Sequence, residues 1–470
     1  MRLLSRASPV LLALGLMACM TAGPDYKLPE TAARALPAAK GAFASAHGKA
    51  FDRAELPDRW WQLYGDARLD GFVAATLAAN ADLRAADANL RRADAVVSEV
   101  MAARTVSTDF DGGTALGRPY DTGAALPGTA SYGLGITVAY PLDLWGRIRR
   151  AIEASQADAE AVAAARDEVR VVVAAETARS YATACLANLT LDAIARVLAL
   201  QEQTLDVTRR LQRGGRGTAF DVTRAQTAVS QSQALIPGTV AVRLAALYRL
   251  ATLMGRPPAD FPRDIATCRV APRLDRGLPV GDGMALMRRR PDIRAAERSL
   301  AAATARIGVA TAGLYPEVSL GGSLGSIGPL AAFGSGSSFD VGIGPLIHWS
   351  FPNRRIVHSQ IAGAQAAADV ALAEFDSVVL EALRQTEASL AAYAGERDRN
   401  AALVGARSSA ATAADQAGRL YRFGRTDFLA LLTAQAVLAS AEASLATSDA
   451  QMIDRQIDVF KALGGGWQGQ

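Results

Sequence analysis

One segment of the chain has the residue types and spacing of a catalytic motif. Gly321-Gly322-Ser323-Leu324-Gly325 fits the G-x-S-x-G turn in which hydrolases expose a nucleophilic serine between a buried strand and a helix. Here Ser323 lies among alternating glycines and serines, and His348 falls in the next extended segment. We therefore expect no hydrolase and no enzyme, and an esterase assay with Ser323→Ala as the control would test this.

Histidine and cysteine are too sparse to suggest a metal centre. His47, His348 and His358 are widely separated, so we expect no metal site and no bound cofactor. Cys185 and Cys268 are compatible with one disulfide or with two packed free thiols, and the sequence leaves both open.

A third cysteine, Cys19, ends a predicted signal peptide over residues 1–18. Two arginines precede a short apolar run that stops at Ala18-Cys19, as in a cleaved export signal. The pattern resembles the bacterial lipobox, which implies diacylglycerol on the Cys19 thiol and an acyl group on the new amino terminus. The residue after Cys19 is Met20 rather than an aspartate, which resembles the pattern of lipoproteins sorted to the outer membrane. The alternative is an ordinary secretory signal that happens to contain a cysteine.

Composition narrows the class of the mature chain. Removing residues 1–18 takes away two arginines, so the formal charge falls from +4 to +2, and nucleic-acid binding gains no support. The segment 19–58, rich in alanine, glycine and proline, reads as a loosely structured, acylated leader. No later segment offers about 20 uninterrupted apolar residues, so we expect that strands, if anything, cross a membrane.

The rest of the chain is internally duplicated. Three pairs of segments match in the same order at nearly constant offsets: 80–90 with 290–300, 131–136 with 338–343, and 215–226 with 424–435. The offset far exceeds the period of solenoid repeats. The sequence therefore predicts two copies of one unit, over 59–262 and 284–470, joined by a connector over 263–283.

Each copy contains a predicted β-hairpin, over 105–143 and 315–351, with a loop rich in glycine, proline and serine at 117–130 and 328–337. Apolar residues alternate with small or polar ones, which is typical of strands with two unlike faces. Four aromatics bracket the aliphatic stretches and are expected at membrane interfaces: Tyr132, Tyr140, Phe339 and Trp349. Tyr132 and Tyr140 would stand about 26 Å apart, near the height of a membrane barrel's apolar band. On the strands alone, a soluble sandwich is an equal alternative.

Long helical patterns favour the membrane interpretation. Alanine-rich patterns are predicted over 146–213, 354–423, 218–254, 427–463, 81–103 and 291–313. The longest would reach roughly 100 Å, which no globular core covers. Four strands cannot close a barrel, so the chain must oligomerise, and three copies would supply twelve strands above a helical tube. A structural lipoprotein built on a coiled coil is the alternative, but it does not explain the hairpins.

Several blocks, spread over the mature chain, resemble a known family. They are Trp60-Trp61-Gln62-Leu63-Tyr64-Gly65-Asp66, Tyr140-Pro141-Leu142-Asp143-Leu144-Trp145-Gly146-Arg147, Arg289-Arg290-Pro291-Asp292-Ile293-Arg294-Ala295-Ala296-Glu297 and Leu463-Gly464-Gly465-Gly466-Trp467. They resemble the outer membrane factors, or TolC-like channels, in the lipoprotein branch that serves resistance-nodulation-division efflux pumps.

The resemblance implies mixed α and transmembrane β structure, in which a duplicated protomer gives four strands to a trimeric 12-stranded barrel and long helices to a periplasmic α-barrel. It also implies a homotrimer in the outer membrane that passively conducts substrates delivered by a periplasmic adaptor (membrane fusion protein) and an inner-membrane pump. A conduit for protein secretion is the alternative. The sequence does not identify the cargo, the pump or the adaptor.

The resemblance also assigns positions to the tube. The periplasmic tips, where an adaptor would bind, correspond to Gly215, Gly217, Gly424 and Arg425. The family narrows its tube with a leucine, an aspartate and an arginine, and the matching positions here are Leu429, Thr433 and Ala436, so the charged latch is missing. Asp221 and Arg224 in the first copy have the i, i+3 spacing of an ion pair. We interpret this pair as an electrostatic gate or, equally, as a structural salt bridge at a helix start.

Overall fold

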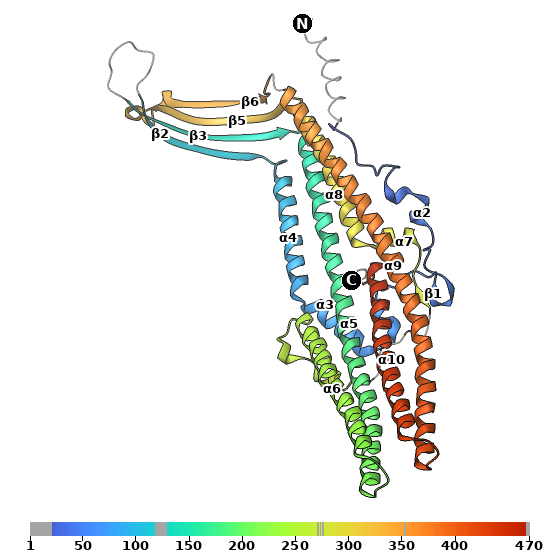
Figure 1. Cartoon of the computed structure of the whole chain (residues 1–470). Coiled ribbons are helices and arrows are strands. Elements are labelled where there is room, and N and C mark those ends of the chain that lie inside the picture. Colours follow the sequence, from blue (N-terminus) through green and yellow to red (C-terminus); the bar gives the residue numbers. More distant parts are fainter. Residues whose placement is uncertain are drawn as a thin grey trace. The chain divides into compact units, whose positions relative to one another are not determined.

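The computed structural model describes residues 21–117, 129–269, 272, 274, 277–351 and 354–466 (Figure 1). The signal peptide with Cys19, most of the loop 117–130, and Trp467 lie outside the described residues. Contacts divide the described chain into two compact units. Unit one holds residues 21–32, 89–163 and 294–376, and unit two holds 33–88, 164–293 and 377–466. Each unit draws on both sequence copies, because the long helices α5 (Arg147–Arg213) and α9 (Arg354–Arg422) contribute to both.

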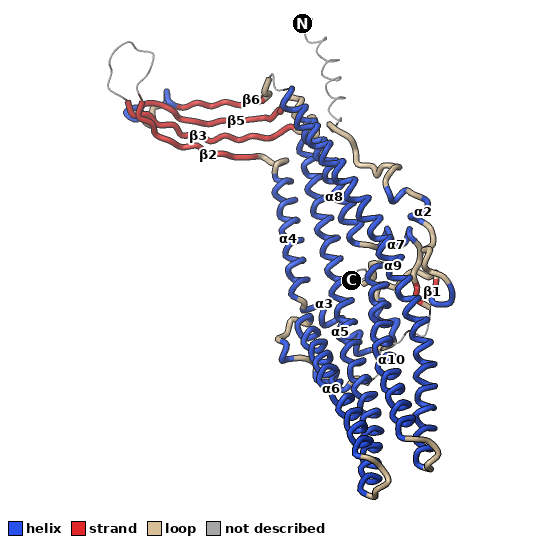
Figure 2. Tube along the Cα trace, viewed as in Figure 1, coloured by secondary structure: helices blue, strands red, loops and turns tan. Residues whose placement is uncertain are grey.

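Unit one is built around a four-stranded antiparallel sheet (Figure 2). Its strands, in spatial order, are β2 (Ser107–Gly117), β3 (Thr129–Leu142), β5 (Glu317–Pro329) and β6 (Phe339–His348). The hairpin of each copy forms as predicted, and β3 pairs with β5, so the two hairpins form one continuous sheet. Most of α4 (Ala81–Ala102) and α8 (Pro291–Ala312) belongs to the same unit.

Unit two contains the remaining helices and most of the buried core. They are α2 (Pro37–Lys40), α3 (Ala67–Ala79), α6 (Ala219–Leu253), α7 (Gly283–Arg289) and α10 (Phe428–Ala462), with short 3-10 turns at Ala33–Ala35, Gly48–Ala50, Trp60–Tyr64, Pro258–Asp260 and Arg263–Thr267. A two-residue parallel pair joins β1 (Phe51–Asp52) to β4 (Leu278–Pro279). Two further 3-10 turns, Leu330–Ala332 and Gly336–Ser338, follow β5 in unit one.

The core of unit two joins sequence blocks that lie at opposite ends of the chain. The ring of Trp60 stacks on Phe460 with centroids 4.7 Å apart. A Cβ on Gly465 would lie 2.8 Å from the Trp60 ring and 2.6 Å from the side chain of Leu56, so only glycine allows the C-terminal segment to pass there. Asp66 caps α3 and also accepts a 2.5 Å hydrogen bond from Tyr181.

The leader differs from the loosely structured segment that the sequence suggests. Residues 33–58 include the short helix α2, strand β1 and 3-10 turns in unit two, and Phe43, Ala50 and Leu56 are buried in its core. The composition did not indicate this burial. The apolar residues of the leader are spaced irregularly and follow neither a helical nor a strand period.

The two cysteines left open by the sequence form a disulfide. Cys185 of α5 bonds to Cys268, which follows the turn Arg263–Thr267, with Cα atoms 4.9 Å apart. The side-chain Nδ2 of Asn188 donates to the Cys268 carbonyl at 2.9 Å. The described part of the connector is therefore fastened to α5.

Three helices, α5, α6 and α10, contain an 18-residue window apolar enough to cross a membrane by length and composition alone. The sequence shows no uninterrupted apolar run of about 20 residues, and these windows reach their hydropathy without containing one. Alanine explains the difference, since it raises hydropathy without forming a continuous bulky run. At 67 and 35 residues, α5 and α6 would be about 100 and 50 Å long, well beyond the ~30 Å hydrocarbon layer.

Candidate functional site

The strand register separates the side chains of the sheet into two unlike faces. One face carries large, exposed apolar residues: Phe110, Leu134, Ile136, Val138, Tyr140, Leu142, Leu320, Leu324, Phe339, Val341, Ile343 and Ile347. Side chains directly opposite one another in antiparallel strands share a face, so these residues form one continuous apolar surface. Such a surface is what a strand sheet presents to lipid.

The opposite face is mainly small, polar or acidic. Its residues include Ser107, Asp109, Asp111, Gly113, Gly133, Gly135, Thr137, Glu317, Ser319, Gly321, Ser323, Gly325, Asp340, Gly342 and His348, with Ile327 and Leu346 as large apolar exceptions. One row across the sheet runs Asp111, Gly135, Gly325, Asp340, so two carboxylates flank two glycines. The strands contain no lysine or arginine over their described lengths. This face is suited to water and carries net negative charge.

Both outer strands have an open edge. In the described sheet β2 pairs only with β3, and β6 pairs only with β5. Their outward N–H and C=O groups need partners, because an unpaired edge is not tolerated in lipid. The sheet is therefore incomplete as a membrane-spanning structure.

Three of the four predicted interface aromatics are exposed, and the fourth is not. Tyr140, Phe339 and Trp349 are 45%, 58% and 51% exposed, whereas Tyr132 is 3% exposed. Phe333 covers the Tyr132 ring at 4.7 Å. The Tyr132 hydroxyl donates to Ser338 at 3.0 Å and lies 2.9 Å from the Ser326 hydroxyl. Tyr132 is therefore buried, unlike the exposed side chain expected of an interface aromatic, because the turn after β5 folds over it.

An aromatic pair that the strand pattern did not indicate lies where the strands of unit one meet its helices. Trp145 stacks on Tyr315 with ring centroids 4.4 Å apart, and its indole N–H donates to the Pro316 carbonyl at 3.1 Å. Both residues lie just outside the strands, so the alternation used to find strand residues did not include them. Asp143 then caps α5 by accepting from the Ile148 and Arg149 amides.

The turns after α5 and α9 have the same backbone structure. Gly215 and Gly424 take φ of 75° and 69°, left-handed values that favour glycine. The amide of the following arginine donates back to the helix in both turns, Arg216 to Leu211 and Arg425 to Leu420, at 2.9 Å. This is the Schellman pattern of helix ends. A Cβ at Gly217 would lie 3.2 Å from the backbone of Gln212.

Both turns are exposed and rich in arginine and aromatic side chains. The residues concerned are Arg213, Arg216, Phe220, Arg422, Phe423 and Arg425. Phe220 and Phe423 are among the most exposed large side chains of unit two, which is typical of a surface that a partner covers. The predicted tip residues therefore lie on accessible basic turns.

The predicted ion pair between Asp221 and Arg224 does not form among the described residues. Asp221 forms a capping box with Thr218, accepting from its amide at 3.1 Å and its hydroxyl at 2.6 Å. The Arg224 guanidinium lies over the Phe220 ring, 5.3 Å from its centroid. The i, i+3 spacing suits an ion pair, but the Asp221 carboxylate is instead engaged by Thr218 in the capping box.

Arg224 instead shares a groove with two of the other constriction candidates. A groove of about 510 Å³ between α6 and α10 is lined by Arg224, Thr433 and Ala436, among others. Leu429 lies one turn before Thr433, which donates its hydroxyl to the Leu429 carbonyl. Deeper in unit two, Gln435 of α10 donates to Thr204 of α5 at 2.8 Å. The structure thus brings a first-copy cation beside the second-copy positions that the resemblance assigned to the constriction.

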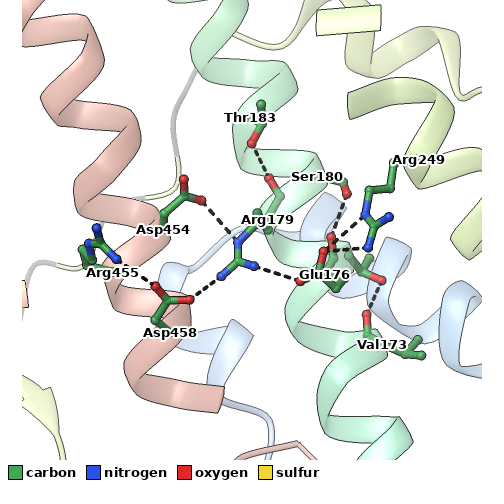
Figure 3. A network of polar contacts seen from close by, with 10 residues as sticks. Val173, Glu176, Arg179, Ser180, Thr183, Arg249, Asp454, Arg455 and Asp458 are labelled. Carbon is green, nitrogen blue, oxygen red and sulfur yellow. Dashed lines mark hydrogen bonds and ion pairs between the residues drawn. The ribbon is translucent and has the colours of Figure 1, made fainter. Parts of the chain in front are cut away.

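A network of ion pairs joins α5, α6 and α10 nearer the core of unit two (Figure 3). Glu176 of α5 accepts from Arg249 of α6 at 3.0 Å and from Arg179 at 2.8 Å. Arg179 also reaches Asp454 and Asp458 of α10, at 3.4 and 2.5 Å. Burial raises the pKa of the Asp454 carboxyl, and Arg179 opposes this rise. One arginine therefore connects the first-copy helices to a second-copy helix.

Among the described residues, Ser323 has no neighbouring histidine and acid of the kind that a hydrolase requires. It pairs with Thr137 and Gly342 in the sheet, while His348 pairs with Glu317 six positions away, roughly 20 Å along the strand. Across the described residues, no three histidine, cysteine, aspartate or glutamate side chains gather as a metal site.

Comparison with known proteins gives a consistent result. The pattern of the family described as "Outer membrane efflux protein" matches residues 73–256 and again 284–465. The outer membrane protein OprJ of Pseudomonas aeruginosa is 30% identical, over 98% of this chain and 95% of OprJ. The toluene efflux pump outer membrane protein TtgC of Pseudomonas putida is 28% identical, over 95% of this chain and 93% of TtgC. The solved structure of the outer-membrane channel OprN is 35% identical with a TM-score of 0.87, over 95% of this chain and 99% of OprN.

The family match spans most of the chain in two blocks, and the likeness to OprN extends over nearly the whole of both proteins. The TolC-like fold and the location in the outer membrane follow, and the family is one of channels rather than enzymes. The chain belongs to the outer membrane efflux protein family.

Proposed function

We propose that three copies of this chain form the outer membrane exit channel of a tripartite efflux system. The observation that carries the proposal is the four-stranded sheet with one apolar face, one polar face and two open edges. Membrane barrels need about eight strands or more, so one chain is too small to close. Three copies supply twelve strands, each β6 pairing with the next β2, with the acidic face lining water.

The channel conducts passively and has no catalytic chemistry of its own. An inner-membrane pump and a periplasmic adaptor deliver the substrate, and the adaptor binds the turns that contain Gly215, Gly217, Gly424 and Arg425. Their exposed arginines and phenylalanines support this assignment, since such side chains are enriched where proteins meet. Acylation of Cys19 adds a lipid tether to the strands' own hold on the membrane, whose boundary lies near Tyr140, Phe339 and Trp349.

The groove between α6 and α10 is the proposed constriction. Its candidate residues are Leu429, Thr433 and Ala436 with Arg224 opposite, while Asp221 acts on the helix start. We expect Arg224→Ala to change single-channel conductance and drug leakage. Unchanged values for both would remove Arg224 from the gate.

The test of the whole proposal uses the acylated, full-length protein. We expect heat-modifiable trimers in outer-membrane fractions, conductance in planar bilayers, and loss of efflux when the gene is deleted with the pump and adaptor intact. Extraction as a peripheral protein without conductance would overturn the proposal.

A further inference from the structure

Residues 21–26, which we call the N-terminal strap, are docked onto unit one by specific contacts. The Ala22 amide donates to the Trp145 carbonyl at 2.9 Å. Arg150, in the first turn of α5, donates to the carbonyls of Ala22 and Gly23 at 3.2 and 3.3 Å and to the Asp25 carboxylate at 2.6 Å. The strap is therefore held by hydrogen bonds at the junction between the sheet and α5.

Arg150 is buried and donates most of its hydrogen bonds to the strap. It is 4% exposed, and among the described residues its hydrogen-bond partner outside the strap is Glu153, at 2.7 Å. A buried guanidinium is tolerated when its donors are satisfied and destabilising when they are not. Without the strap, Arg150 would keep one of these four contacts.

Three glycines allow the strap to approach the helices closely. A Cβ on Gly308, in the interior of α8, would lie 2.7 Å from both the Ala22 carbonyl oxygen and Cγ of Arg150. A Cβ on Gly23 would lie 2.4 Å from Cα of Gly308, and one on Gly146 would lie 2.4 Å from the Thr21 methyl. Glycine inside a helix is less stable than alanine, so its use at position 308 is accounted for by this contact.

The internal duplication supplies a built-in comparison. Helices α4 and α8 are both 22 residues long, and the position in α4 that matches Gly308 is Ser98, which is exposed and bonds only to its own helix among the described residues. The position in α9 that matches Arg150 is Val357, a buried apolar residue near Gly313. Both strap-binding features occur once, at the place where the strap docks, so the repeated fold itself does not require them.

We propose that this site seats the acylated N-terminus and so fixes where the lipid enters the membrane, an inference that rests on the proposed acylation and outer-membrane location. Cys19 precedes Thr21 by two residues, which span at most about 7 Å. Thr21 lies against Gly146, beside the Trp145–Tyr315 stack and close to the end of β3 at Leu142. Aromatics of this kind mark the membrane–water boundary. Arg150 is the positioning residue, and its strap contacts place the acyl chains in the leaflet that borders the strand ends.

The first test measures docking directly, with a spin label on Pro24→Cys in the acylated trimer. Pro24 is exposed, and the described cysteines are paired, so the label reports on the strap. We expect an immobilised label in the parent and about a tenfold larger mobile fraction in Arg150→Ala or Gly308→Ala, since charge-assisted bonds or close packing are lost. Ser98→Ala, the matched change in α4, should leave the spectrum unchanged. Equal spectra for Gly308→Ala and Ser98→Ala would overturn the docking.

The second test separates lipid placement from general packing. Trimer assembly is followed in outer-membrane fractions for Arg150→Ala, for Cys19→Ala with an ordinary signal-peptidase site, and for both together. We expect Arg150→Ala to slow assembly of the acylated protein and to have no further effect on the Cys19→Ala protein. Equal slowing in both backgrounds would show that the strap is a packing element only. A parent trimer that docks its strap but fails to conduct would instead contradict the channel proposal.

Discussion

Arg290 connects three parts of unit two through one buried side chain. Its guanidinium donates to both oxygens of Asp292 at 2.9 and 2.6 Å, to the Ala462 carbonyl at 2.9 Å and to Gln385 at 3.0 Å. The planar fork of arginine matches these acceptors, whereas the point charge of lysine does not. A residue between α7 and α8 thus donates a hydrogen bond to a carbonyl in the last turn of α10.

We expect Arg290→Ala to lower the free energy of unfolding by about 3–5 kcal/mol, because Asp292 and the Ala462 carbonyl would be left without this donor. Arg290→Lys should recover only part of the loss. Thermal unfolding of the purified trimer, followed by circular dichroism, measures both. Arg288→Ala is the control, since its pair with Glu55 is solvent-exposed and worth at most ~1 kcal/mol. Equal losses at the two positions would contradict the assignment.

Glu168 of α5 makes the stability of the folded state depend on pH. Burial raises its pKa above the ordinary 4.5, the nearby Asp292 adds to the rise, and Arg290 and Lys461 oppose it. A carboxyl with a raised pKa in the folded state destabilises that state once it ionises, so the penalty develops as pH rises from the ordinary value through the raised one. We expect Glu168→Gln to raise Tm at pH 8 and to leave Tm unchanged at pH 4. A larger gain at pH 4 than at pH 8 would reverse the sign and refute this account.

Among the elements, the long helices were the most predictable. All six helices expected from the sequence begin and end within one residue of the expected positions. Their ends carry local signals: Thr218 and Asp427 accept amide hydrogen bonds at helix starts, and left-handed glycines follow α5 and α9. Local backbone chemistry sets these boundaries, so a single sequence contains the information.

Features set by tertiary contacts were not predictable in this way. The turn that covers Tyr132, the path of the leader, and the pairing of Cys185 with Cys268 all depend on segments far apart in the chain. Asp221 shows a subtler limit, because two local interactions compete for its carboxylate and spacing alone does not rank them. The sequence therefore indicated the regions of the site, which are the two faces of the sheet and the two turns, more accurately than the contacts of individual residues.

The stability of the protein should depend on the disulfide that fastens the connector to α5. We expect Cys185→Ser with Cys268→Ser to lower stability by roughly 2–4 kcal/mol, because the bond restricts the unfolded chain. Thermal unfolding with and without reductant measures this. Reductant should bring the parent's Tm down to that of the double variant and leave the variant unaffected. A fall of equal size in the variant would show that reductant acts elsewhere.

For the whole molecule, the acidic face of the sheet determines what the closed barrel admits. In a trimer, Asp109, Asp111 and Asp340 would each occur three times on the water-lined wall, with no basic strand residue to offset them in the described strands. Rings of carboxylates favour cations in channels. The sheet therefore predicts a cation-selective barrel.

We expect Asp111→Asn with Asp340→Asn to move the zero-current potential in a KCl gradient toward zero, because the row that crosses the sheet loses its charge. Planar-bilayer recordings measure this. Asp369→Asn with Glu374→Gln removes two exposed carboxylates from α9 and serves as the control. The same shift in both proteins would mean that overall charge, not the strand row, sets selectivity.

The open edges of β2 and β6 also have a genetic consequence. In the proposed trimer each chain closes the barrel with two neighbours, so a chain that enters the trimer but cannot conduct would inactivate its normal partners as well. If normal and blocked alleles are expressed equally and their chains mix at random, roughly one trimer in eight consists only of normal chains in such a closed three-fold ring. Co-expression should therefore reduce efflux far below half. A reduction to only half would indicate that each trimer assembles from chains of one allele. Resistance that depends on this channel would be sensitive to a dominant inhibitor made from its own sequence.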